Sequence, residues 1–167
     1  LLDPAVRVYV LELSSFQLER SRPLRLCAAT ILNITPDHID LHGDMAAYAR
    51  AKARIWQAAQ VAVVNRDAPE THALVPAGAT VLRFGLGPPA GGEFGLVEHR
   101  GGAWLAHGPR PLLPAAELPM AGRHNVANAL AALALVAAAG HAPGDLAPAL
   151  RDYRPLPHRM AVVPTTD

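Results

Sequence analysis

Three apolar runs in the first 65 residues have the pattern of buried strands. Each run is almost continuously apolar rather than alternating, which is typical of parallel strands that are covered on both faces. A polar residue follows each run: Glu12, Asn33 or Asn65. The runs are 6–11, 28–32 and 61–64. We therefore predict an α/β fold with a mostly parallel sheet flanked by helices. Ligands of such sheets bind at the carboxyl ends of the strands, which makes the polar residues site candidates.

Helical patterns lie between and after these runs. We predict an amphipathic helix over about 45–59 with Asp44 as its N-cap, and an alanine-rich helix over about 125–139 that Gly140 ends. A shorter helix is predicted over 144–153.

Residues 76–119 change character, because glycine and proline are frequent and the apolar runs are short. We predict a small antiparallel subsheet here, with Gly101-Gly102 as a hairpin turn. Its strands are 80–84, 94–97 and 103–105.

The end of the chain predicts a domain boundary. Two prolines in 155–157 mark a linker, and the apolar run 160–163 looks like the first strand of another domain. We expect 1–154 to belong to one domain and 155–167 to be the hinge and first strand of the next, in a piece of a longer protein.

Composition and charge narrow the classes of function. The 167 residues are 51% hydrophobic and 17% charged, with a net charge of +1, which excludes a disordered chain and predicts neither a nucleic-acid nor a membrane partner. The apolar stretch 129–139 is too short for a bilayer span, so a cytoplasmic location is expected. Cys27 is the single cysteine, which excludes a disulfide framework and predicts core packing.

One lysine, Lys52, stands among 15 basic residues. A helical wheel places it in the apolar stripe of 45–59, between Tyr48 and Ile55. Such a lysine must snorkel, find an acidic partner or lose its charge. The neutral amine is a nucleophile that can add to carbon dioxide, and the resulting carbamate would suit magnesium. Chance survival of one lysine is the plainer alternative.

Acidic residues and a histidine follow the second apolar run. Asp37, His38 and Asp40 could ligate a hard cation together with Glu12. Asp37 could equally be a turn residue and His38 a surface histidine. The other histidines outside recognisable motifs are predicted to be surface residues: His42, His72, His99, His107 and His141.

Two amides lie at the start of the alanine-rich helix. Asn125 and Asn128 are three residues apart, so both could read the edge of a nucleobase, although Asn125 could equally be a plain N-cap. Arg159 follows a proline-rich hinge and could reach a phosphate or ribose. The sequence contains no GxxxxGK[ST] phosphate loop.

Taken together and in order, these segments resemble the Mur ligases, ATP-dependent enzymes that form amide bonds in peptidoglycan synthesis. The matching segments are ELSSFQLE (12–19), ILNITPDHID (31–40), YARAK (48–52), GRHNVAN (122–128) and LPHR (156–159). The ELSSFQ form is most similar to the members that add D-glutamate to UDP-N-acetylmuramoyl-L-alanine. The resemblance implies the second half of a P-loop-type central ATP-binding domain, incomplete here, whose phosphate loop and outer N- and C-terminal domains belong to the same longer chain.

The resemblance also implies roles for single residues. Glu12 would bind one Mg²⁺, and His38 with a carbamylated Lys52 would bind a second. Ser14 and Gln17 would lie near the UDP substrate. The nucleotide ATP would contact Asn125, Asn128, His158 and Arg159.

These roles imply transfer of the γ-phosphate to the substrate carboxylate and attack of the D-glutamate amine on the acyl phosphate. Such a ligase would serve cell-wall biogenesis, cell shape and cell division. We expect the 167-residue piece alone to be inactive. Three alternatives remain: a Mur-type ligase for another amino acid, a metal-dependent hydrolase that uses a carbamylated lysine, and a non-catalytic binding module.

Overall fold

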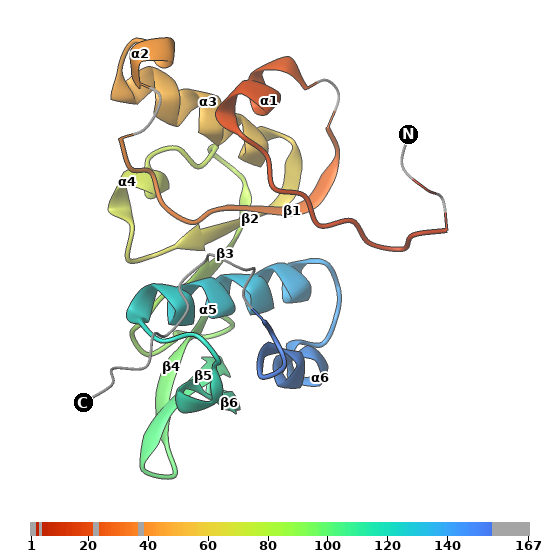
Figure 1. Cartoon of the computed structure of the whole chain (residues 1–167), viewed down its shortest axis with the longest axis vertical. Helices are drawn as coiled ribbons and strands as arrows, with labels where there is room; N and C mark the ends of the chain where they lie inside the picture. Colours follow the sequence, from red (N-terminus) through yellow and green to blue (C-terminus); the bar gives the residue numbers. More distant parts are fainter. Residues whose placement is uncertain (1–2, 4, 22–23, 37–38, 155–167) are drawn as a thin grey trace, which may run out of the picture.

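The computed structural model describes residues 3, 5–21, 24–36 and 39–154. Within these residues a six-stranded sheet is ordered as the chain is, from β1 to β6 (Figure 1). Neighbours from β1 to β4 are parallel, and β4, β5 and β6 are antiparallel. The strands are β1 (Leu26–Ile31), β2 (Ala59–Asn65), β3 (Thr80–Phe84), β4 (Phe94–His99), β5 (Gly102–His107) and β6 (Arg110–Pro114). The predicted α/β class, with a mostly parallel sheet and a small antiparallel part, is confirmed.

Helices cover both faces of this sheet (Figure 1). On one face lie α1 (Ser15–Arg20), α2 (Ile39–His42), α3 (Met45–Gln57) and α4 (Pro69–His72), and on the other lie α5 (Arg123–Ala138) and α6 (Pro143–Leu146). Two 3₁₀ turns, η1 (Ala115–Glu117) and η2 (Ala147–Leu150), complete the elements of the described part. No helix in the described ranges combines the length and apolarity that crossing a membrane requires.

The predicted helices are confirmed for α3 and α5 and wrong for 144–153. The Asp44 carboxylate accepts a hydrogen bond from the Ala47 N–H at 2.6 Å, as an N-cap does, and α3 ends at Gln57. After α5, Gly140 takes a φ of +84°, which glycine adopts without strain. The 144–153 region divides into α6 and η2, because Pro148 lacks the N–H that a continuous helix would use.

Strand β2 shows why a continuous apolar run predicts a parallel strand. Val63 is fully buried and faces the α5-side core, the cluster that includes Phe84, Phe94, Leu130 and Leu133. Its neighbours in sequence, Ala62 and Val64, face the α3-side core, the cluster of Ala29, Ile31, Trp56, Ala62 and Val64. The run 61–64 of β2 therefore lies in protein on both faces, and it contains no polar residue.

Trp56 fixes α3 to the sheet. The residue is 2% exposed, and its indole N–H donates to the Ala29 carbonyl of β1 at 3.2 Å. A large ring at this position fills the α3-side core while its one polar atom is satisfied. This contact anchors α3 to β1.

The prediction of a buried strand over residues 6–11 is wrong. The segment joins no strand of the described sheet, and its apolar side chains are exposed, with Val10 at 89% and Val8 at 48%. Apolar composition predicts a strand, but a strand forms only where a neighbour satisfies its backbone hydrogen bonds. The sheet pairs β1 with β2 on one side, and the 6–11 segment does not extend the ladder on the other.

The glycine-rich region differs from its prediction in two details. Strand β3 was expected in the antiparallel subsheet but is parallel to β2, because the chain returns through α4 before entering it. The hairpin turn between β4 and β5 is Arg100-Gly101, since Gly102 already pairs with His99. Both turn residues have positive φ, 53° and 77°, as a two-residue turn that matches the strand twist requires.

Cys27 was expected in the core, but it is exposed in the structure. It lies near the amino end of β1 and belongs to neither of the two apolar cores.

Candidate functional site

Two asparagines at the carboxyl ends of the first two parallel strands lie at one edge of the sheet. Asn33 is exposed after β1, and Asn65 is the last residue of β2. The Asn65 side chain stays local: its Oδ1 accepts from the Asp67 N–H at 3.0 Å, and its Nδ2 reaches the Leu32 carbonyl at 3.5 Å. The structure therefore shows Asn65 holding the turn after β2 beside the end of β1.

Glu12 is exposed in extended chain just before α1. Its carboxylate makes no hydrogen bond or ion pair with any residue that the structure describes. A carboxylate oxygen is the donor that Mg²⁺ prefers, so the chemistry and the accessibility of Glu12 fit a magnesium ligand.

Ser14 and Gln17 form the N-terminal cap of α1. The Ser14 hydroxyl accepts from the Gln17 N–H at 3.3 Å, and the Gln17 Oε1 accepts from the Ser14 N–H at 2.8 Å. Such a reciprocal capping box satisfies two backbone donors that the helix itself leaves free. The pair therefore has a structural task, while the Nε2 of the exposed Gln17 makes no hydrogen bond with the described residues.

Lys52 is half-buried on α3, on the same side as the buried residues Tyr48, Ala51 and Trp56. Its Nζ lies 5.1 Å from the centre of the Tyr48 ring. The helical wheel thus placed Lys52 on the correct side, and its neighbour there among the described residues is an aromatic face rather than a carboxylate.

The two amides at the start of α5 differ in their surroundings. Gly122, with a φ of +104°, is the N-cap of α5, so Asn125 is not a plain N-cap. Asn125 is buried, at 7% exposure, and its Nδ2 donates to the Ala121 carbonyl at 2.7 Å. Asn128, one turn on, is exposed and available to a ligand.

Several predicted site residues lie outside the described residues: Asp37, His38, His158 and Arg159. Among the residues that are described, no three His, Cys, Asp or Glu side chains gather as a metal site would require.

His42 was predicted to be a surface histidine, and this is wrong. Its side chain is 4% exposed and lies between the rings of Phe16 and Tyr48. Its Nε2 is 2.9 Å from the Ser15 hydroxyl. The signal in the sequence was slight: a histidine one residue before Gly43-Asp44, where one helix ends and the next begins. Of the other four, His72 and His141 are exposed, whereas His99 and His107 are partly buried.

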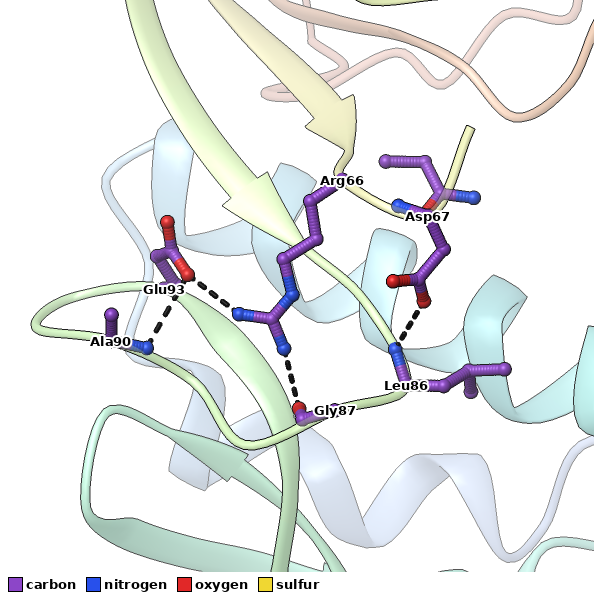
Figure 2. A network of polar contacts seen from close by, with 7 residues as sticks. Arg66, Asp67, Leu86, Gly87, Ala90 and Glu93 are labelled. Carbon is purple, nitrogen blue, oxygen red and sulfur yellow. Dashed lines mark hydrogen bonds and ion pairs between the residues drawn. The ribbon is translucent and has the colours of Figure 1, made fainter. Parts of the chain in front are cut away.

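A polar network that the sequence did not reveal holds the loop after β3 (Figure 2). The Arg66 Nη1 donates to the Glu93 Oε2 at 2.6 Å, and its Nη2 donates to the Gly87 carbonyl. Beside it, the Asp67 Oδ2 accepts from the Leu86 N–H at 2.6 Å. Gly85 is the one available signal, because a Cβ there would lie 2.6 Å from the Arg66 side chain.

Two comparisons define the class of protein. Residues 1–136 match the family model of the Mur ligase middle domain, so the chain belongs to this family. Among solved structures, MurF from Acinetobacter baumannii superposes with a TM-score of 0.67 at 26% identity, covering 90% of this chain and 34% of that one. UDP-N-acetylmuramate-alanine ligase MurC from Thermotoga maritima has a TM-score of 0.60 at 24% identity, over 84% of this chain and 31% of its own, which shows the shared fold.

Similarity in sequence is greater to one kind of Mur ligase. The UDP-N-acetylmuramoylalanine--D-glutamate ligase of Methylobacillus flagellatus is 48% identical over an alignment of 167 residues that covers 99% of this chain and 37% of that protein. The ligase of the same name from Nitrosococcus oceani is 49% identical over 156 residues, 93% of this chain and 34% of that protein. The chain therefore spans little more than a third of the length of these relatives.

Proposed function

We propose that this chain is the middle part of a ligase that uses ATP to join D-glutamate to UDP-N-acetylmuramoyl-L-alanine in cytoplasmic peptidoglycan synthesis. The observation that carries the proposal is the identity of 48–49% to two ligases of that name over 93–99% of this chain. Residues 1–154 would then end the central domain, and residues 155–167 would begin the next.

The proposed reaction has two steps. A carboxylate oxygen of the UDP substrate bonds to the γ-phosphorus of ATP as the bond to the β-phosphate oxygen breaks, leaving ADP and an acyl phosphate. The D-glutamate nitrogen then bonds to the acyl carbon, the carbon–oxygen bond to phosphate breaks, and the amine loses a proton. The free energy of ATP hydrolysis is thereby transferred to an amide bond.

We assign the ligands of magnesium to Glu12, to His38 and to a carbamate on Lys52. When bound there, magnesium would neutralise the negative charge that ATP and the substrate carboxylate bring together. Two facts support the assignment. Glu12 offers an accessible carboxylate oxygen, and the Lys52 side chain is half-buried on α3, with its Nζ held close to the helix over the Tyr48 ring.

The other proposed contacts are to nucleotide and substrate. Asn128, which is exposed, would hydrogen-bond the nucleotide directly, and Asn125 would hold the turn before α5 in place through Ala121. His158 and Arg159 complete the proposed nucleotide contacts. Ser14 and Gln17 would meet the UDP substrate, with the Gln17 Nε2 as the donor that the capping box leaves free.

A second candidate, the same reaction with another amino acid, is favoured by one observation: the fold is shared with MurF and with an alanine ligase. Amino-acid-dependent phosphate release by the full-length enzyme separates the two. We expect release with UDP-N-acetylmuramoyl-L-alanine and D-glutamate, and none with L-glutamate, L-lysine or glycine. Release with L-lysine or glycine in place of D-glutamate would refute the proposed substrate.

A further inference from the structure

His42 lies at the junction of three helices. It is the last residue of α2, and Gly43 follows with a φ of +88°, its N–H donating to the Ile39 carbonyl at 2.8 Å. This closed turn directs the His42 side chain inward, where it is 4% exposed. The imidazole stacks on Phe16 of α1 at 4.8 Å and 16°, and tilts against Tyr48 of α3 at 5.4 Å and 49°.

The edges of the imidazole carry polar contacts to α1. Its Nε2 is 2.9 Å from the Ser15 Oγ, and Ser15 is itself 3% exposed. Its Nδ1 is 3.8 Å from the Glu19 carboxylate. A carboxylate on that side favours the tautomer with a proton on Nδ1, so Nε2 accepts the hydrogen bond from the Ser15 hydroxyl.

These contacts lead in two directions. Ser15 is the first residue of α1 and follows Ser14, whose capping box with Gln17 begins the helix. Tyr48 carries Lys52 over its ring, with the Lys52 Nζ 5.1 Å from the ring centre. His42 is therefore hydrogen-bonded to the first turn of α1, next to Ser14 and Gln17. It also packs against Tyr48, the ring that the Lys52 side chain contacts.

We propose that His42 is a positioning residue, which holds the start of α1 and the Lys52 face of α3 in one fixed arrangement. The inference rests on the proposed function, in which Ser14 and Gln17 meet the substrate and Lys52 serves the phosphoryl transfer. The distance between groups on these two helices must then be constant to within a fraction of an ångström. Rigid packing together with a hydrogen bond keeps it constant.

Two substitutions separate the hydrogen bond to Ser15 from the ring contact with Tyr48. His42→Phe keeps a ring between Phe16 and Tyr48 and removes the acceptor for Ser15. His42→Gln keeps an amide near the position of Nε2 and removes the ring beside Tyr48. The matched control is His99→Phe, because His99 also makes a ring contact, edge-on to Trp104 at 4.9 Å, but lies in the β4–β5 hairpin.

The first measurement is steady-state kinetics of the full-length enzyme below its melting temperature, normalised to folded enzyme. We expect His42→Phe to lower kcat about tenfold or more while the KM for ATP stays within about twofold, because α5 is untouched. Ser15→Ala should cause a similar loss, and combining the two should add little, since both break the same bond. A role in stability alone would lower the melting temperature and leave kcat unchanged.

The second measurement does not depend on activity. The full-length enzyme is labelled with ¹³C at the ε carbons of lysine, and the Lys52 resonance is identified by its loss in Lys52→Arg. We expect His42→Gln to move this resonance toward that of an exposed lysine, because Tyr48 loses the ring that orients it. His99→Phe should leave the resonance in place.

The outcomes are distinct. A wild-type enzyme that forms no D-glutamate product would refute the proposed function, and the Lys52 resonance would still test the positioning role. An active wild type with an unchanged kcat in His42→Phe, or a Lys52 resonance that does not move in His42→Gln, would overturn the inference about His42.

Discussion

The ammonium group of Lys52 lies over the ring of Tyr48, four residues earlier on the same helix, with 5.1 Å between Nζ and the ring centre. Residues at this spacing lie one above the other on a helix, and an aromatic face attracts a cation. The contact keeps the head of a long, flexible side chain close to α3.

Replacing Lys52 with arginine tests whether its amine is needed. Arginine retains a positive charge and can stack on Tyr48, but it cannot form a carbamate. In the full-length enzyme we expect D-glutamate-dependent phosphate release to fall by about 10²- to 10³-fold. The melting temperature should change little. A rate near that of the wild type would leave Lys52 with a structural role only.

The amides of α5 are expected to respond differently to alanine. Asn128→Ala should raise the KM for ATP about tenfold, the effect of one lost hydrogen bond, without changing stability. Asn125→Ala should lower the free energy of unfolding by about 1 kcal/mol, because the bond from Nδ2 to the Ala121 carbonyl is lost. Kinetics and thermal unfolding of both variants measure this contrast. If Asn128→Ala and Asn125→Ala changed the KM for ATP alike and the stability alike, this contrast would be contradicted.

The ion pair between Arg66 and Glu93 is expected to stabilise the loop after β3. Their side chains are 19% and 22% exposed, and the Glu93 carboxylate also accepts from the Ala90 N–H at 3.3 Å. Glu93→Ala should lower the free energy of unfolding by about 2 kcal/mol, because Arg66 loses its charged partner. Glu93→Gln should lower it by about half as much. Thermal unfolding followed by circular dichroism measures both. A Gln variant less stable than the Ala variant would argue against this account.

Thr30 of β1 offers a way to stabilise the protein. Its Oγ1 is buried and has no hydrogen-bond partner among the described residues. Thr30→Val replaces the hydroxyl with a methyl group of similar shape and should raise the free energy of unfolding by about 1 kcal/mol. Thr30→Ser, which keeps the hydroxyl and loses the methyl group, should be less stable than the wild type. A destabilised Val variant would show that the hydroxyl has a partner in solution.

Much of the fold could be predicted from local patterns. The start of α3 at Asp44, its apolar stripe and the end of α5 at Gly140 each depend on residues only a few positions away. The nearby sequence is therefore enough to predict them. The strand predicted over 6–11 failed because an apolar run does not specify its hydrogen-bonding partner. The predicted direction of β3 was wrong for a similar reason, because the direction depends on the crossover through α4 rather than on residues 80–84 themselves.

The candidate site was predictable to a lesser degree. The buried side of α3 located Lys52 correctly, because helical periodicity reports burial. The Ser14-x-x-Gln17 spacing is a capping-box signature that the sequence does display, and only the structure showed that both side chains form it. His42 could not be found in this way, since its partners Ser15, Phe16, Glu19 and Tyr48 come together only when α1 packs on α3.

The order of the strands bears on how the protein is made. Because β1 to β6 are neighbours in the sheet in the same order as in the chain, each strand can pair with one that has already been synthesised. Helix α5 differs from the strands, because its residues Leu130 and Leu133 pack on strands that were synthesised much earlier. Until α5 has been made, one apolar face of the growing sheet stays open to water, and exposed apolar surface of this kind promotes aggregation.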